Sequence, residues 1–216
     1  VSEAGVITYT AAITDAQGNP VKVTGSDVVV TLGNGEKITI PVGQTGASIN
    51  VAAPNDVYNG AAPVKTEITG TTGGDFENLG ANKTPVETTV TDKVDDTTVT
   101  LSATPTVSES GAITYTANIT DAQGNPVKVT GSDVVVTLGN GEKITIPVGQ
   151  TGASINVAAP NDVYNGAAPV KTEITGTTGG DFENLGANKT PVETTVTDKV
   201  DDTTVTLTAS PSTVEG

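Results

Sequence analysis

The stretch VSEAGVITYTAAITDAQGNP, residues 1–20, returns nearly unchanged as VSESGAITYTANITDAQGNP at residues 107–126. The similarity extends beyond both stretches, because residues 1–101 and 107–207 differ at three positions only: Ala4/Ser110, Val6/Ala112 and Ala12/Asn118. The period of 106 residues is an ordinary size for one domain. The sequence therefore predicts two tandem copies of one domain.

Each copy contains short runs in which apolar and polar residues alternate, as in half-buried β-strands. In the first copy, residues 6–14 alternate in this way and end at the turn sequence DAQGNP, and an Asn-Gly hairpin is expected at residues 33–35. Further strands are expected at residues 21–32, 36–42, 47–53, 64–70 and 86–93. Strands of this length and spacing are typical of a β-sandwich. We expect an all-β protein of two tandem Ig-like β-sandwich domains, each with about seven strands of the Greek-key type.

The seventh strand is expected in TDKVDDTTVTLSATPTVSESG, residues 91–111, which joins the two copies. This segment could be a flexible linker, but residues 97–104 alternate Thr with Val and Leu and so predict a strand that opens the second domain. An alternative phasing makes residues 97–101 the last strand of the first domain. The preferred phasing gives domain 1 at residues 1–95, domain 2 at residues 96–202, and the start of a following repeat at residues 203–216.

On this phasing, domain 1 lacks its first strand or receives it from another molecule. Residues 203–211 repeat that strand after the second domain has ended. We expect this tail to pair with domain 1 of a neighbouring molecule by strand complementation. The expected partners are therefore neighbouring identical repeats of a monomeric chain, with end-to-end strand exchange in crystals.

The composition argues against several classes of function. The chain has no Cys and no His, which excludes zinc sites of the usual kind and Cys or His catalysis. Its net charge of −15 disfavours contact with nucleic acid or anionic membranes and favours cations. No segment approaches the roughly 18 consecutive apolar residues of a membrane span, and Val1 does not open a signal peptide. We expect a soluble fragment of a larger protein, without membrane insertion.

Acidic residues gather in the predicted loops at both ends of each sandwich. Candidate calcium ligands of the first copy are Glu3, Asn55, Asp56, Asp95 and Asp96 at one end, and Asp15, Asp75 and Glu77 at the other. With domains stacked end to end, the first group would face Asp121, Asp181 and Glu183, and the next junction would use Glu109, Asp162, Asp201 and Asp202. Carboxylates so placed would repel one another, so a hard cation with about six to eight oxygen ligands is expected, and irregular loops favour Ca²⁺ over Mg²⁺. The alternative is that each Asp or Asn is an ordinary turn residue.

Several segments resemble the extender repeats of giant bacterial RTX adhesins, and the resemblance covers the whole chain. Besides the opening stretch, they are APNDVYNG at residues 53–60, TGGDFENLGANKTPVETTVTDKVDDTTVTL at residues 72–101 and TASPSTVEG at residues 208–216. The resemblance implies Ig-like extenders in large numbers, secreted by a type I system. They would hold an adhesive tip away from the bacterial surface during biofilm formation, with Ca²⁺ stiffening the junctions. By position, it assigns calcium roles to Glu3/Glu109, Asp56/Asp162 and Asp95/Asp201.

Three classes of function were weighed. A spacer, whose working properties are length and stiffness, agrees with near-identical copies and a junction without a Gly- or Pro-rich linker. A module that itself binds a glycan, a surface or ice is the alternative, with Thr-x-Thr alternation at residues 8–10 and the loop residue Tyr58 as its candidates. An enzyme is not expected, because carboxylate catalysis of glycoside chemistry needs a cleft and substrate-binding aromatics.

Overall fold

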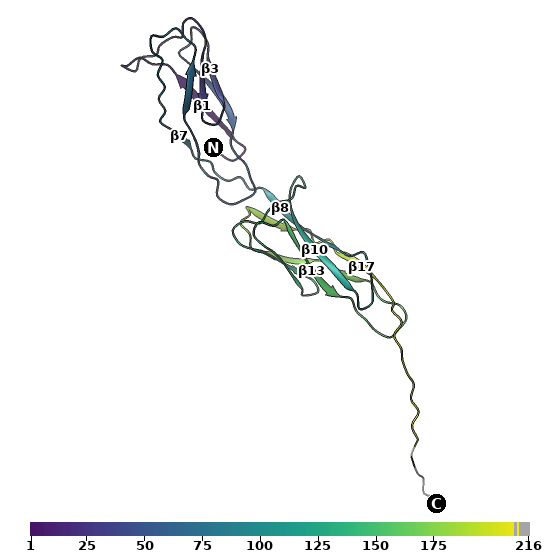
Figure 1. Cartoon of the computed structure of the whole chain (residues 1–216). Helices are drawn as coiled ribbons and strands as arrows, with labels where there is room; N and C mark the ends of the chain where they lie inside the picture. Colours follow the sequence, from purple (N-terminus) through teal and green to yellow (C-terminus); the bar gives the residue numbers. More distant parts are fainter. Residues whose placement is uncertain (210, 212–216) are drawn as a thin grey trace, which may run out of the picture. The chain divides into compact units, whose positions relative to one another are not determined.

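A computed structural model describes residues 1–209 and 211 of the chain. The chain divides into two compact units, unit 1 at Val1–Asp95 and unit 2 at Asp96–Gly216. The described residues form strands, turns and loops without a helix (Figure 1), so the expected all-β class is confirmed. Accordingly, the described part of the chain holds no helix with the length and apolarity to cross a membrane.

Unit 2 is built from three sheets. The largest has the order β13-β10-β8-β16, and the two smaller ones have the orders β12-β11-β15 and β14-β17-β9. Its strands are β8 Asp96–Ala103, β9 Thr106–Ser108, β10 Ala112–Asp121, β11 Val134–Leu138, β12 Lys143–Ile146, β13 Gly152–Ala158, β14 Val170–Thr172, β15 Ile174–Thr178, β16 Asn184–Ala187 and β17 Val192–Thr197.

Unit 1 repeats most of this arrangement with fewer strands. Its sheets have the orders β1-β4, β3-β2-β6 and β5-β7. Its strands are β1 Val6–Ala12, β2 Val28–Leu32, β3 Lys37–Ile40, β4 Gly46–Ala52, β5 Val64–Thr66, β6 Ile68–Thr72 and β7 Val86–Thr88. The pairing registers match between the units: Tyr9 lies opposite Ile49 in unit 1, as Tyr115 lies opposite Ile155 in unit 2.

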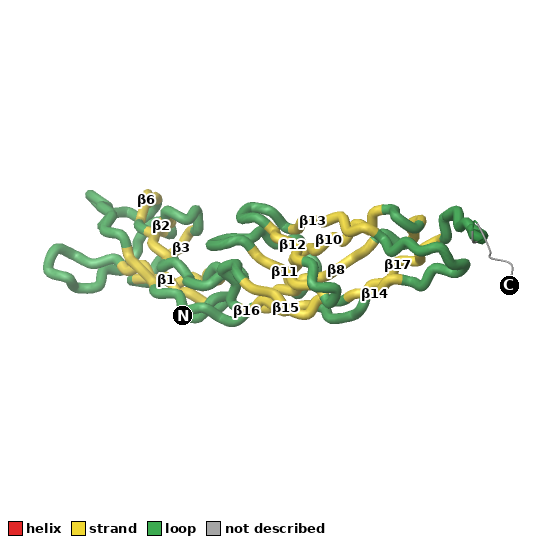
Figure 2. Tube along the Cα trace, turned by 90° about the horizontal axis from the view of Figure 1, so that it is seen from below, coloured by secondary structure: helices red, strands yellow, loops and turns green. Residues whose placement is uncertain are grey.

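The strand expected at residues 97–104 is β8, and both of its partners belong to unit 2. It pairs antiparallel with β10, with Val99 opposite Ile119, and parallel with β16, with Thr97 opposite Leu185. In Figure 2, β8 lies beside β10 in the second unit. The alternative phasing, which gave this strand to the first copy, is therefore wrong.

The chain enters and leaves unit 2 at opposite ends. β8 continues past Pro105 into β9, and β9 pairs in parallel with β17, with Thr106 opposite Thr195. The turn after β9 lies at the same end as the close of β17, because the Glu109 amide donates to the Thr197 carbonyl at 2.9 Å. β10 then runs back the full length of the sheet, which is about 33 Å for its ten residues.

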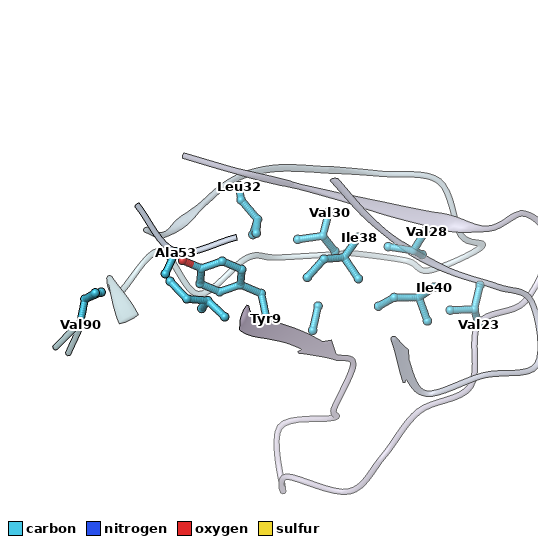
Figure 3. Close-up of a cluster of buried hydrophobic side chains, with 11 residues drawn as sticks. Tyr9, Val23, Val28, Val30, Leu32, Ile38, Ile40, Ala53 and Val90 are labelled. Atoms are coloured by element: carbon cyan, nitrogen blue, oxygen red, sulfur yellow. The ribbon is translucent and has the colours of Figure 1, made fainter. Parts of the chain in front are cut away.

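Alternating side chains from the facing sheets form each core. In unit 1, Val28 and Val30 of β2 and Ile38 and Ile40 of β3 gather with the ring of Tyr9 (Figure 3), and all five are buried. The equivalent residues of unit 2 are buried more completely, since Tyr115 is 1% exposed where Tyr9 is 7% exposed. Burial raises the pKa of the Tyr115 hydroxyl.

Several predicted strands differ from the observed ones. Residues 21–27 form no strand, because their amides bond to other loops; the Val23 amide, for example, donates to the Gln44 carbonyl. The strand expected at residues 64–70 is divided into β5 and β6, beside a register shift between Thr31 and Leu32 of β2. In unit 2 the long loop after β15 contains an unpredicted strand, β16. Residues 203–209, predicted as a strand, form none.

Candidate functional site

A buried carboxylate lies in the tight turn at the end of unit 2 where the chain leaves. Glu109 follows β9 directly, is 3% exposed, and its Oε2 accepts a hydrogen bond from the backbone amide of Lys199 at 3.1 Å. Ser110 completes the turn with a positive φ of 58°. Glu3 of unit 1 is likewise 3% exposed and accepts from the Lys93 amide at 3.3 Å.

An aspartate that the sequence argument left out of its candidate set lies beside this turn. The Asp198 carboxylate accepts hydrogen bonds from the amides of Gly166 and Ala167, at 2.6 and 2.7 Å. In unit 1, Asp92 bonds to the amides of Gly60 and Ala61, and these two bonds hold the pKa of Asp92 below its ordinary value. The one available signal was its position three residues before the predicted ligand Asp95.

The third acidic position at this end is Asp201, whose neighbours differ from the expectation. Its Oδ2 accepts from the Asn161 side chain at 2.7 Å, and its Oδ1 pairs with the Lys199 ammonium at 3.1 Å. The amide hydrogen bond first, and the lysine second, lower the pKa of Asp201. Asp95 of unit 1 has the same two partners, Asn55 and Lys93, and a lowered pKa. Most of these carboxylates were expected to lack a nearby lysine, but this one has an ammonium partner.

The structure thus brings three predicted residues of unit 1 together at one end. Lys93 joins Glu3, through its backbone amide, to Asp95, through its side chain, and Asn55 binds the same Asp95. One carboxylate oxygen of Glu3 also lies within 4.8 Å of one of Asp92. Neither Glu3 nor Asp92 belongs to any of the four ion pairs found among the described residues. Two close carboxylates, one of them buried, form an oxygen-rich pair that suits a hard cation such as Ca²⁺.

Other candidate residues have local partners within their own units. Asp15 and Asp121 each accept three hydrogen bonds inside their turns, the first from Gln17 and Asn19, and these bonds lower the pKa of both aspartates. Asp56 and Asp162 each accept from the amide two residues later. These contacts are those of the turn-residue alternative.

The remaining candidates lie away from the Glu3 and Glu109 turns. Asp96, the first residue of β8, accepts a hydrogen bond from the Asn184 side chain at 2.7 Å. Asp75 and Glu77 are exposed in the long loop after β6, and their counterparts Asp181 and Glu183 are half-buried in the loop before β16. Asp202 is exposed beyond β17.

The Thr-x-Thr face of β1 is bonded across the sheet. The Thr8 hydroxyl donates to the Asn50 side chain at 2.8 Å, and the Thr10 and Ser48 hydroxyls lie 2.7 Å apart. Unit 2 repeats both contacts. Cross-strand bonding of this kind belongs to the solvent face of an ordinary sheet.

The sequence matches the LapA domain at residues 1–93 and again at residues 95–199. The chain belongs to the LapA domain family. The resemblance to the repeats of the biofilm adhesin LapA is thereby confirmed.

Other comparisons with the LapA chain add little. Domains 4–9 of the surface layer protein SbsC are similar at 16% identity, with a TM-score of 0.26. That match covers 94% of this chain and 27% of the SbsC chain. No match was found among curated proteins.

The two LapA units differ at one edge of the β1 sheet, although their sequences are nearly identical. In unit 2, β8 occupies the position between β10 and β16. In unit 1, no described strand occupies the equivalent position beside β1, and residues 78–81, which correspond to β16, form no strand. Two hollows of about 390 and 430 Å³ lie there and share Ala11, Ile68 and Asn82 in their linings. Unit 1 therefore has an open edge.

Proposed function

We propose that this chain is a structural extender of a very large bacterial surface adhesin, and that it works outside the cell. Its two units are assigned as tandem Ig-like β-sandwiches of the Greek-key type. They would project a distal adhesive tip from the cell surface and have no catalytic role. Membership of the LapA domain family supports an adhesin-related role.

The observation that carries the proposal is that the chain enters and leaves unit 2 at opposite ends. β8 and β9 run in one direction, and the parallel partner of β9, β17, ends beside the Glu109 turn. Each further copy joined in this way would add at least the length of β10, which is about 33 Å for ten residues. Units whose ends lie on the same side would add little length, so this topology suits a spacer.

Calcium is the second part of the proposal. The Glu3, Asp92 and Asp95 carboxylates of unit 1, and their counterparts Glu109, Asp198 and Asp201, supply oxygen ligands at the end where each unit gives way to the next residues of the chain. Calcium bound there would relieve the repulsion among the carboxylates and stiffen the array. Binding only to the folded state would add about 2.7 kcal/mol of stability when free calcium is about 100 times its Kd.

The spacer is tested by X-ray scattering of chains with increasing numbers of repeats. A spacer predicts a maximum dimension that grows in proportion to the number of copies. Growth as the cube root of chain length would show compact packing and overturn the spacer. Thermal melting and scattering with Ca²⁺ and with a chelator test the calcium part. If neither the melting temperature nor the maximum dimension changes, calcium has no stiffening role.

A further inference from the structure

We propose that the open edge of unit 1 binds residues 202–209 of a second copy of this chain. The segment would add to β1 as an antiparallel strand and fill the position that β8 fills in unit 2. Each molecule carries one such segment and one such edge, so the contact is head-to-tail. The inference depends neither on calcium nor on the spacer function.

The proposed occupant has the sequence that the position requires. Residues 202–209 read DTTVTLTA, and β8 reads DTTVTLSA, so the two differ only at Ser102/Thr208. Their environments are opposite: Val99 in β8 is 0% exposed, whereas Val205 is 100% exposed. The same apolar side chain is thus in the core in one copy and in solvent in the other, which favours burial of the free copy.

The open edge lacks the burial that β8 provides. Ile119, which lies opposite Val99, is 0% exposed, but its counterpart Ile13 is half-buried. Ile174 is likewise 0% exposed, and its counterpart Ile68 is half-buried and lines both hollows. The sequences around these residues are the same in both units, so the missing strand accounts for the difference.

Polar partners for a docked strand are also in place. In unit 2, the Thr97 hydroxyl donates to the Asn184 carbonyl at 2.9 Å, and the Asn188 amide donates to the Val99 carbonyl at 2.8 Å. Unit 1 offers the equivalent groups on Asn78 and Asn82. The register follows from β8: Val205 opposite Ile13, and Leu207 opposite Ala11.

A second copy, and not the same molecule, is assigned as the donor. Unit 1 ends at Asp95 and β8 begins at Asp96, so no linker residues remain between them. Without a linker, the chain has no segment that would let unit 1 turn back to its own tail. Head-to-tail contacts between copies do not have to close, so chains of two, three and more molecules are expected as the concentration rises.

Sedimentation velocity over a concentration series, at constant salt, tests the association. The matched variants Val205→Lys and Thr206→Lys add the same charge to a tail that forms no strand, so neither disturbs the folded units. Val205 corresponds to the buried Val99 and Thr206 to the half-buried Thr100. V205K should raise the midpoint concentration of association by more than about tenfold, and T206K should change it much less. A wild-type chain that stays monomeric at every concentration, or equal effects of both variants, would overturn the inference.

Cysteine cross-linking tests the register, because the natural chain has no Cys. Thr116 lies opposite Ser102 in unit 2, which predicts that Thr10 of one molecule lies opposite Thr208 of another. A mixture of T10C and T208C chains should form a disulfide-linked dimer, whereas T10C with T204C, four residues away on the same face, should not. If the chain with both T10C and T208C closes on itself as a monomer at high dilution, the donor is the same molecule and the inference fails.

Discussion

The Glu109 carboxylate accepts a hydrogen bond from the Lys199 amide, ninety residues later in the chain, at 3.1 Å. The bond holds the turn after β9 against the segment that leaves β17. Glu109 is 3% exposed, so its contact is shielded from water. Unit 1 has the same arrangement between Glu3 and Lys93. The stability of this end, and its response to calcium, can therefore be separated by substitution.

Replacing Glu3 and Glu109 together should distinguish the two roles. Glutamine keeps an acceptor for the lysine amide, so E3Q/E109Q should retain stability in a chelator but lose much of the stabilisation by calcium. Alanine leaves both amides without this acceptor and should cost about 1–3 kcal/mol per unit even without calcium. Urea denaturation with and without calcium measures both effects. An unchanged calcium increment in the glutamine variant would remove these residues from the ligand set.

The aspartates of this end predict how stability depends on pH. Hydrogen bonds lower the pKa of Asp92, Asp95 and Asp201 in the folded chain. Their contribution is therefore complete above the unfolded pKa of about 3.9 and is lost as the pH falls through the lowered folded values. Thermal melts over an acid series should show this decline, and it should be shallower in D95N/D201N. An equal slope in that variant would contradict the assignment.

Two glycines of unit 2 provide a matched test of backbone geometry. Gly141 and Gly179 have φ values of 88° and 90°, which disfavour any residue with a Cβ. Around Gly141 there is open space, so G141A should cost only the conformational term of about 1–2 kcal/mol. At Gly179 an added Cβ would overlap the Asp133 carbonyl oxygen, so G179A should cost more. Chemical denaturation of the two variants should give this order, and a reversed order would contradict the structure.

Hydrogen exchange should report the open edge directly. β10 has hydrogen-bonding neighbours on both sides, whereas β1 has only β4 among the described strands. Amides of β1 should exchange faster than those of β10 at protein concentrations too low for association. Peptides from the two strands can be told apart by mass, because residue 12 is alanine and residue 118 is asparagine. Equal protection in the two strands would show that the edge is not open.

The features that the sequence predicted well are those with a clear local pattern. The alternation of Thr with Val and Leu predicted β8 within one residue at each end. By contrast, β16 lies in a loop rich in Gly and Asn and forms where β8 supplies a partner, which a local pattern does not reveal. The acidic ends were only partly predictable: Glu3 could be placed from loop positions, but Asp92 acts through backbone amides of a distant loop.

The parallel pairing of β9 with β17 has a mechanical consequence. Tension applied along the chain pulls β8 and β9 toward the Asp96 end of unit 2 and pulls β17 toward its opposite end. Neighbouring parallel strands drawn apart in this way slide along each other, so their hydrogen bonds are loaded together in shear and do not open one at a time. A unit built in this manner resists stretching through its unfolding rate, which governs how long it survives under load.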